Sequence, residues 1–223
     1  MFQVNHLSLI YDIEKEEKVC AVNDVTIQLP DKGMIGIIGP SGSGKSSLMY
    51  CLSTLKKATS GEIFYNGKDY RTLSHAELET LRRERFGFVF QHHFLIGYMN
   101  VLDNVIVAAK GSIAEARERA QELLQALSIR SSELKKKPGQ LSGGQRQRCA
   151  IARALMNRPE VVFADEPTAS LDHENAFQVM HYLQEYAKEH LVLIITHDHS
   201  ILKEADRVIE IWDGEVSEKG AVQ

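Results

Sequence analysis

Hydrophobic and polar positions follow two different patterns along the chain. In the first, they alternate near the N-terminus, with Phe2, Val4, His6 and Ser8 on one face and Gln3, Asn5, Leu7 and Leu9 on the other. A second alternating run, VTIQL, covers residues 25–29. Alternation with a period of two is typical of strands that have one exposed face. These segments predict a partly exposed sheet in the N-terminal part of the chain.

The other pattern consists of continuous apolar runs. They are MIGII at residues 34–38, VVFA at 161–164 and LVLIIT at 191–196. Strands that are buried on both faces have this composition, and they belong to parallel sheets covered by helices. The runs therefore predict an α/β protein with a parallel-sheet core.

Between the first two apolar runs, the pattern changes to that of amphipathic helices. SHAELETLRRER and SIAEARERAQELLQALSI each begin with Ser followed three places later by Glu, as Ser74 with Glu77 and Ser112 with Glu115. This spacing predicts a reciprocal capping box at each helix start. The second segment also has an apolar stripe at helical spacing, formed by Ile113, Ala116, Ala120, Leu123, Leu124 and Leu127.

These patterns predict one domain over residues 1–223. Its core and β subdomain would comprise residues 1–91 and 159–223, interrupted by a mainly helical subdomain over 92–158. Near the C-terminal end, Asp213 and Gly214 stand between two β-like runs and predict a tight hairpin.

Composition excludes several classes of protein. The chain is 43% hydrophobic and has a net charge of -4, so it can bury a core and has no overall basic field that would attract nucleic acid. Its three cysteines form no CxxC pair, which predicts reduced thiols in the cytosol. The sequence shows neither a secretory leader nor an apolar stretch of membrane-spanning length. We therefore expect a soluble cytoplasmic protein whose membrane role, if any, requires a partner.

The stretch GPSGSGKSS fits the phosphate-binding pattern GxxxxGK[ST], directly after an apolar strand and before the helix-compatible SSLMYCLSTL. Its glycines let backbone N–H groups surround phosphate, while Lys45 reaches the β- and γ-oxygens and Ser46 ligates Mg²⁺. A plain glycine-rich turn would explain neither Lys45 nor Ser46. The predicted nucleotide-binding residues here are Gly39, Pro40, Ser41, Gly42, Ser43, Gly44, Lys45, Ser46 and Ser47.

Two acids follow the second apolar run, in VVFADEP. Because adjacent residues at a strand end point to opposite sides, Asp165 and Glu166 should divide the work. We expect Asp165 to hold Mg²⁺ and Glu166 to polarise the attacking water. The alternative is an acidic cap before Pro167.

Three further residues are candidates because of their positions at or near strand ends. His197 follows the third apolar run, where it could contact the γ-phosphate, and a metal pair with His199 is disfavoured because no cysteine or carboxylate cluster accompanies it. Gln91 closes FGFVFQ and is expected to reach the same site, as a metal ligand with Ser46 and Asp165. Tyr11, at the end of the first strand, could stack on adenine or simply pack. Since there is no NKxD motif for guanine, ATP is the expected nucleotide.

The stretch LSGGQRQRCA raises the question of a second phosphate contact. Ser142 and Gln145 fit a capping box that starts a helix over 146–156, but two glycines would destabilise its first turn unless something approaches the backbone closely. A second contact to the γ-phosphate explains Ser142, Gly143, Gly144 and Gln145 together. The spacing leaves open whether this loop serves its own chain or another copy.

These motifs occur in one order: GPSGSGKSS, Gln91, LSGGQ, VVFADEP, SLD at residues 170–172, and His197. In this order the chain resembles, over nearly its whole length, the ATPase subunit of an ABC transporter. The resemblance implies a P-loop NTPase fold in which a RecA-like parallel-sheet core carries an N-terminal antiparallel β subdomain and a helical signature subdomain. It also implies ATP hydrolysis with Mg²⁺.

The resemblance further implies a head-to-tail homodimer, or a dimer with a related ATPase subunit, that sandwiches two ATP molecules. Residues 142–145 of one subunit would contact the γ-phosphate bound by residues 39–47 of the other. In this scheme, Lys45, Gln91, Glu166 and His197 are the catalytic set. The implied roles are adenine stacking for Tyr11, coupling to a membrane partner for Gln91, general base for Glu166, bridging of the two sites for Asp172 and switch histidine for His197.

Three stretches make the chain similar to the lipoprotein-releasing, macrolide-exporting and cell-division group of this family. They are TSGEIFYNGKD, LRRERFGFVFQHHFLIGYMNVLDNV and the end soon after the WDG hairpin. The chain differs from the group at GYMN, residues 97–100, where a proline and a Leu-Thr pair are more usual. The resemblance implies a peripheral place on the inner face of the cell membrane, with an integral permease docked near Gln91–Val105.

Two other functions remain as alternatives. A soluble ABC ATPase that remodels a ribosome or DNA complex is disfavoured because the chain has one cassette and no heptad run. An ATP-binding scaffold without turnover is disfavoured because Lys45, Asp165, Glu166 and His197 are all present. Lys135–Lys137 is expected to be a solvated loop, and Arg146 with Arg148 a helix face, so no nucleic-acid partner is expected.

Overall fold

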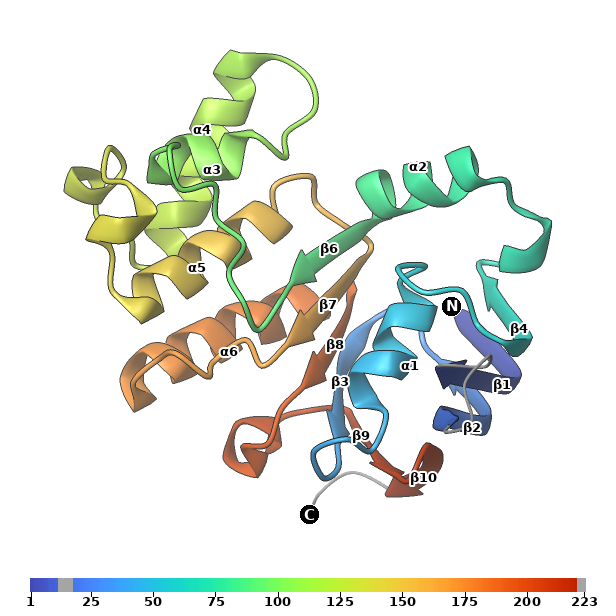
Figure 1. Cartoon of the computed structure of the whole chain (residues 1–223). Helices are drawn as coiled ribbons and strands as arrows, with labels where there is room; N and C mark the ends of the chain where they lie inside the picture. Colours follow the sequence, from blue (N-terminus) through green and yellow to red (C-terminus); the bar gives the residue numbers. More distant parts are fainter. Residues whose placement is uncertain (12–17, 220–223) are drawn as a thin grey trace.

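The computed structural model describes residues 1–11 and 18–219, and within them ten strands form two sheets (Figure 1). The larger sheet has the strand order β10-β9-β3-β8-β7-β6. Its strands are β3 (Gly33–Ile38), β6 (Phe86–Val89), β7 (Val161–Asp165), β8 (Leu191–Ile195), β9 (Arg207–Trp212) and β10 (Glu215–Lys219).

The five strands from β9 to β6 are mutually parallel, with Ile35 opposite Leu193 and Phe163 opposite the same leucine on its other side. Every residue of β7 and β8 is buried. Continuous apolar runs form these strands because helices or the second sheet cover both faces. The predicted parallel-sheet core is confirmed.

The smaller sheet is antiparallel and has the order β2-β1-β4-β5. Its strands are β1 (Phe2–Tyr11), β2 (Val19–Leu29), β4 (Ser60–Tyr65) and β5 (Lys68–Asp69). The predicted alternation of β1 is wrong after Val4, because the pairing shifts between Val4 and Leu7 and His6 has a φ of 50°. This bulge turns Leu7 and Leu9 to the buried face that Phe2 and Val4 begin.

The helices lie on both sides of the larger sheet (Figure 1). They are α1 (Lys45–Leu52), α2 (His75–Arg85), α3 (Val101–Ile106), α4 (Ile113–Ala126), α5 (Gly143–Ala154) and α6 (His173–Ala187). Short 3₁₀ turns are η1 (Tyr70–Thr72), η2 (Ser131–Glu133), η3 (Pro138–Gln140) and η4 (His199–Leu202). Between β6 and β7 the chain forms helices α3, α4 and α5 with η2 and η3, so an all-helical insert stands where one was expected.

Two hydrophobic cores result from this layering. One packs the inner face of the smaller sheet and α1 against the larger sheet, with Phe2, Leu48 and Phe163 among its buried residues. The other joins the insert helices and α6 to the larger sheet and includes Leu124 and Ile151. The sheet thus connects the two parts of the molecule that carry the predicted motifs. The exact boundaries at 91/92 and 158/159 stay a prediction.

The local helix signals are confirmed in part. Ser74 with Glu77 forms the full capping box, whereas Ser112 accepts from the Glu115 backbone N–H without the return bond from the Glu115 side chain. Ile113, predicted to lie in the apolar stripe, is 75% exposed because it occupies the first helical position, before the helix contacts its neighbours. The Asp213-Gly214 hairpin is confirmed, with positive φ at both residues.

In the part of the chain that the structure describes, helices are too short or too polar for any of them to cross a lipid bilayer.

Candidate nucleotide-binding site

The GPSGSGKSS loop joins the end of β3 to the start of α1, as its sequence context predicted. Gly44, the residue directly before α1, has a φ of 102°, and a Cβ there would lie 1.9 Å from the Ala21 carbonyl oxygen. Only glycine fits this position, because any side chain would collide with the backbone of β2. The loop therefore curves tightly and directs the N-terminus of α1 toward the space that it encloses.

Lys45 is buried and donates to the carbonyl oxygens of Gly39 and Pro40, at 2.9 and 2.7 Å. Burial lowers its pKa, and the nearby Glu166 and Asp165 carboxylates oppose that shift. The Ser43 hydroxyl in the same loop is buried and makes no hydrogen bond to the described residues. A buried ammonium and an unpaired hydroxyl inside a curved backbone fit the oxygens of a phosphate chain.

Asp165 and Glu166 have different neighbours, Ser46 and His197 respectively. Asp165, the last residue of β7, accepts from the Ser46 hydroxyl at 3.0 Å across 119 positions of sequence. Burial raises the pKa of Asp165, while the Ser46 hydrogen bond and Lys45 lower it in part. A hydroxyl and a carboxylate at this distance are a fitting pair of oxygen donors for Mg²⁺.

Glu166 turns to the other side, toward His197. Its backbone is in the left-handed region at φ 51°, and its N–H donates to the Ile195 carbonyl on β8. Glu166 Oε1 lies 3.6 Å from His197 Nε2, is buried, and accepts no hydrogen bond from the described residues. Burial raises the pKa of Glu166 and His197 lowers it in part. A strained backbone and a buried carboxylate with spare accepting capacity are typical of a general base.

Tyr11 lies beside the phosphate loop through its hydroxyl, which is 3.3 Å from the Ser47 hydroxyl. The Lys56 ammonium stands 4.9 Å from the centre of the Tyr11 ring, on one of its faces. The Tyr11 residue is half-buried. Its predicted stacking on adenine stays a prediction.

Among the described residues, no hydrogen bond connects Gln91 to the phosphate loop or to Asp165, Glu166 or His197. The predicted strand over 86–91 is too long, because β6 ends at Val89 and the chain turns away at Phe90. Gln91 is exposed at the start of the connection to α3. Its assignment as metal ligand and coupling residue stays a prediction.

The second predicted loop lies elsewhere in the molecule. Ser142 caps α5, and Ser142 and Gln145 form the expected capping box, although the helix begins at Gly143 instead of 146. Asp172 caps α6 by accepting from the Asn175 N–H at 2.9 Å. Figure 1 shows the N-termini of α5 and α6 on the same side of the molecule, well apart from α1. One chain therefore does not bring Ser142–Gln145 to its own phosphate loop.

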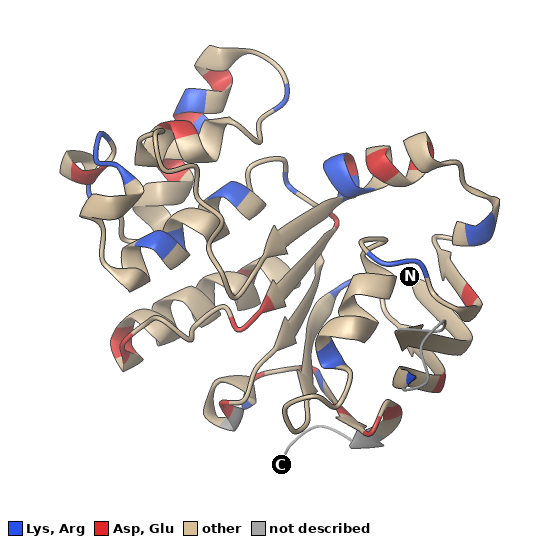
Figure 2. Cartoon of the chain, in the orientation of Figure 1, with Lys and Arg blue, Asp and Glu red and all other residues tan. Residues whose placement is uncertain are grey.

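Charged side chains are distributed accordingly. In Figure 2 the ribbon is coloured acidic where β7 ends and basic at the start of α1. The Glu166 and Asp165 carboxylates are near enough to Lys45 to raise its pKa against the effect of burial. Among the side chains that the structure describes, no group of three His, Cys, Asp or Glu forms a metal cluster. The alternative of a His197–His199 metal pair stays untested, because the side chain of His199 lies outside what the structure describes.

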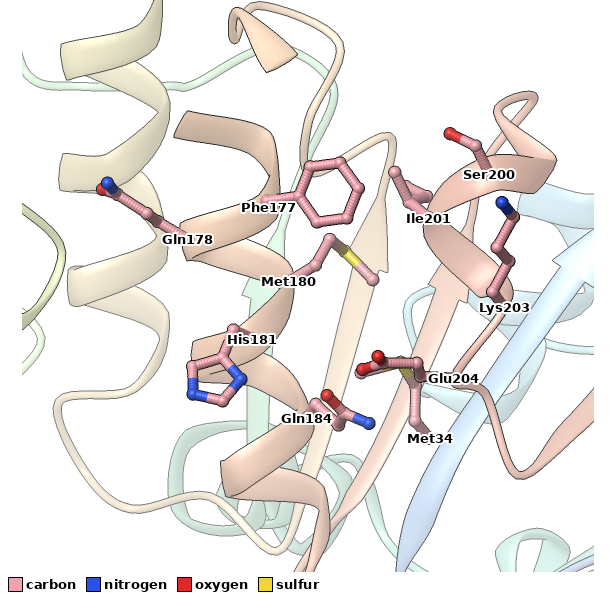
Figure 3. A pocket seen from close by; sticks show the side chains of 10 residues that line it. All are labelled: Met34, Phe177, Gln178, Met180, His181, Gln184, Ser200, Ile201, Lys203 and Glu204. Atoms are coloured by element: carbon pink, nitrogen blue, oxygen red, sulfur yellow. The ribbon is translucent and has the colours of Figure 1, made fainter. Parts of the chain in front are cut away.

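A surface pocket of about 440 Å³ lies between α6 and the turn η4 (Figure 3). Its lining residues are Met34, Phe177, Gln178, Met180, His181, Gln184, Ser200, Ile201, Lys203 and Glu204. This set contains none of the predicted nucleotide-binding residues.

Sequence reasoning missed several polar side chains that hold the loops in place. Arg148 lies on a helix, as predicted, but it is only 8% exposed and donates to Asn175 on α6. Glu133, also buried, accepts from the Gln145 amide. No signal in the sequence marks these contacts, because each joins residues of different elements.

The segment between Gln91 and α3 is held in a similar way. Asn104 is fully buried and bonds to backbone groups of Ile96, Met99 and Asn100. Arg153 on α5 donates to the carbonyl oxygens of His93 and Phe94, both at 2.7 Å. The fixed backbone presents two exposed aromatic rings, with Phe94 65% and Tyr98 77% exposed.

The parallel sheet with a GxxxxGK[ST] loop between β3 and α1 defines a P-loop nucleotide-binding protein. A model of the family described as "ABC transporter" matches residues 22–169. The chain belongs to the ABC transporter family.

Relatives and solved structures agree with this membership. The chain is 43% identical to the macrolide export ATP-binding/permease protein MacB of Shewanella oneidensis over 204 residues, 89% of this chain and 31% of the relative. It is 45% identical to MacB of Escherichia coli O157:H7, over 90% of this chain and 32% of that protein. The chain thus spans about a third of the length of these curated relatives.

Two structures of the bacterial ABC transporter cassette MJ0796 match the whole chain. Both have a TM-score of 0.94 and 34% identity, with complete coverage of both chains. Both are described as dimeric, and one is a post-hydrolysis state bound to ADP and phosphate. The likeness confirms the predicted fold class, with its β subdomain and helical insert.

Proposed function

We propose that this chain is the ATP-hydrolysing subunit of a membrane transport or export complex and that two copies enclose two ATP molecules. One observation carries the proposal: the phosphate loop and the Ser142–Gln145 loop lie apart in a single chain. Each is half of a phosphate site, and a head-to-tail pair of chains joins the halves. The dimeric state of the MJ0796 cassette supports this arrangement.

The phosphate loop, residues 39–47, binds the phosphates of ATP through its backbone N–H groups and Lys45. Ser46 and Asp165, with Gln91, would hold Mg²⁺, which supplies neutralisation of phosphate charge. Glu166 accepts a proton from the attacking water, and His197 stands beside it at 3.6 Å. Tyr11 stacks on the adenine ring.

The other copy contributes residues 142–145, whose capped helix start directs backbone N–H groups at the γ-phosphate. Asp172 of that copy bridges the two sites. ATP then holds the chains together, and its hydrolysis releases them. Binding energy of the γ-phosphate is thereby converted into movement of whole subunits.

The membrane partner docks on the segment from Gln91 to Val105. Exposed Phe94 and Tyr98 on a backbone held by Asn104 make this a preformed apolar surface beside the site. The MacB relatives carry both "ATP-binding" and "permease" in their names, which favours the macrolide-export and lipoprotein-releasing group. The chain would then lie in the cytoplasm on the inner face of the membrane. The ribosome or DNA alternative is not favoured by the relatives.

A Glu166→Gln variant tests the chemistry. It should bind Mg-ATP and form a stable dimer in size-exclusion chromatography, while the rate of phosphate release falls about 10²-fold or more because the general base is absent. Wild-type chain should dimerise only transiently. Near-normal turnover by the variant would remove Glu166 from its assigned role.

The same variant tests the partner. Tagged Glu166→Gln, trapped with Mg-ATP in detergent-solubilised native membranes, is pulled down, and mass spectrometry identifies the proteins that accompany it. A membrane protein with few spans and a large extracytoplasmic domain is expected. Ribosomal proteins or nucleic acid instead would overturn the membrane role and leave the ATPase chemistry intact.

A further inference from the structure

A cluster of polar side chains lies beneath the Ser142–Gln145 loop and links α5 to the start of α6. Glu133 and Arg148 are 7% and 8% exposed, which is rare for charged residues without a strong partner. Glu133 accepts from Gln145, and Arg148 donates to Asn175. These residues line one side of a polar pocket of about 760 Å³. The cluster lies outside the phosphate loop and is not used by the chemistry above.

Asn175 occupies the centre of this cluster. Its amide oxygen accepts from Arg148, and its amide nitrogen donates to the Asp172 carboxylate at 2.7 Å. Its backbone N–H also donates to Asp172, at 2.9 Å. A single side chain thus connects α5, the helix that Ser142 caps, with the residue proposed to bridge the two ATP sites.

Backbone packing joins the same two segments. A Cβ placed on Gly144 would lie 3.0 Å from a Leu171 methyl group and 3.3 Å from the Ser170 carbonyl oxygen. The loop at 142–145 therefore lies directly on the residues before Asp172. This close approach accounts for glycine at position 144 independently of any phosphate contact.

We infer that Asn175 is a positioning residue that holds residues 142–145 and Asp172 as one unit, presented to the ATP bound by the other copy. The inference rests on the proposed head-to-tail function. It follows from geometry: both segments belong to the half of the site that acts on the neighbour, and Asn175 bonds to Asp172 and to Arg148, which lies on α5, the helix that contains residues 143–145.

The chemistry of the amide explains why this residue suits the position. An asparagine side chain both accepts and donates, so it can join a guanidinium to a carboxylate. Aspartate would accept from Arg148 but repel Asp172, and leucine would serve neither partner. Arg148 depends on this bond, since its Nε is buried and has no hydrogen-bond partner among the described residues.

Complementation between chains tests the inference. Asn175→Leu alone should lower the rate of phosphate release about tenfold, while ADP binding by the monomer and the melting temperature show a folded chain. It is then mixed with Glu166→Gln before Mg-ATP is added. In the mixed dimer, one site combines the intact phosphate loop and Glu166 of the first chain with the intact residues 142–145 of the second. Turnover should therefore rise several-fold above the sum of the separate variants.

A parallel mixture of Ser142→Arg with Glu166→Gln distinguishes failure of the head-to-tail proposal from failure of the positioning role of Asn175. If this mixture fails to recover turnover, the head-to-tail proposal itself fails. If it recovers and the Asn175→Leu mixture does not, Asn175 acts only within its own chain and the inference is overturned. Normal turnover by Asn175→Leu alone would overturn it as well.

Two further variants guard the result. Gln184→Leu changes a polar residue of similar size on the same helix, away from Asp172, and should retain wild-type turnover. Asn175→Asp keeps an acceptor for Arg148 and a negative charge at a helix N-terminus, so it should fold even if the leucine variant does not. It should show the same loss and the same recovery in the mixture, and wild-type turnover by Asn175→Asp would count against the inference.

Discussion

The two halves of the proposed ATP site differ in where their polar groups lie. In the phosphate-loop half, Lys45 at the start of α1 and Asp165 at the end of β7 are buried, and burial shifts the pKa of each. In the half around residues 142–145, Ser142 and Asp172 are exposed helix caps that act on backbone N–H groups. Reacting charges thus belong to one half, and a presented backbone surface belongs to the other.

Because of this difference, we expect the phosphate-loop half alone to bind nucleotide, whereas turnover requires both halves. A buried charged half can hold nucleotide by itself, because its donors and acceptors converge within one chain. The exposed half around residues 142–145 and Asp172 contacts no nucleotide until the ATP-loaded phosphate loop of a second chain packs against it. The comparison therefore predicts that damage to the two halves has different consequences.

The largest expected effect compares Lys45→Ala with Ser142→Arg. Both should lower turnover about 10²-fold or more, since each removes contacts to the charge that develops on the γ-phosphate. Only Lys45→Ala should also weaken nucleotide binding by the monomer, measured by calorimetry, because Lys45 lies in the half that binds without a partner. Lys68→Ala, a change at an exposed lysine, is the control. Loss of monomer binding in Ser142→Arg would refute the division.

A second effect concerns pH. Burial raises the pKa of Glu166, and a general base works only when ionised, so turnover is lost as pH falls through that raised pKa. The acid limb of kcat should therefore lie above the ordinary range of a glutamate. His197→Ala removes the ring that lowers this pKa, so the limb should move to still higher pH. An acid limb that stays in place in the His197 variant would show that Glu166 is not the titrating group.

A smaller effect is expected at the adenine end. Tyr11→Ala should raise the KM for ATP about 2- to 10-fold, since aromatic stacking contributes about 0.5–1.5 kcal/mol. Tyr11→Phe keeps the ring and loses only the hydroxyl contact to Ser47, so its KM should stay near that of the wild type. Equal KM values for all three chains in steady-state kinetics would mean that Tyr11 is a packing residue.

The smallest effect compares two serine N-caps, each of which accepts from the backbone N–H three residues on. Ser112→Ala and Ser142→Ala each remove an N-cap hydrogen bond and should each lower the free energy of unfolding by about 1 kcal/mol in urea titrations. Only Ser142→Ala should also lower kcat, because Ser112 caps a helix that carries no predicted ATP contact. A matching fall in kcat for Ser112→Ala would point to general loosening of the insert.

Several features of the fold were predictable because they depend on neighbouring residues. The continuous apolar runs predicted β3, β7 and β8, and the Ser-x-x-Glu spacing predicted the start of α2. The strand-loop-helix context predicted the phosphate loop. Errors occurred where tertiary structure, and not the local pattern, sets strand pairing and burial, as in the bulge at His6, the exposed Ile113 and the early end of β6.

The sequence by itself determined the chemistry of this protein: the phosphate loop, the acids after β7, the histidine after β8 and the capped glycine loop are all written in short segments. Only the tertiary structure decided which of them meet. It joined Ser46 to Asp165 and Glu166 to His197, it kept residues 142–145 apart from the phosphate loop, and it buried Arg148 against Asn175. The reason is physical, since a local pattern specifies backbone conformation, whereas packing of one core against another sets the distances between segments remote in sequence.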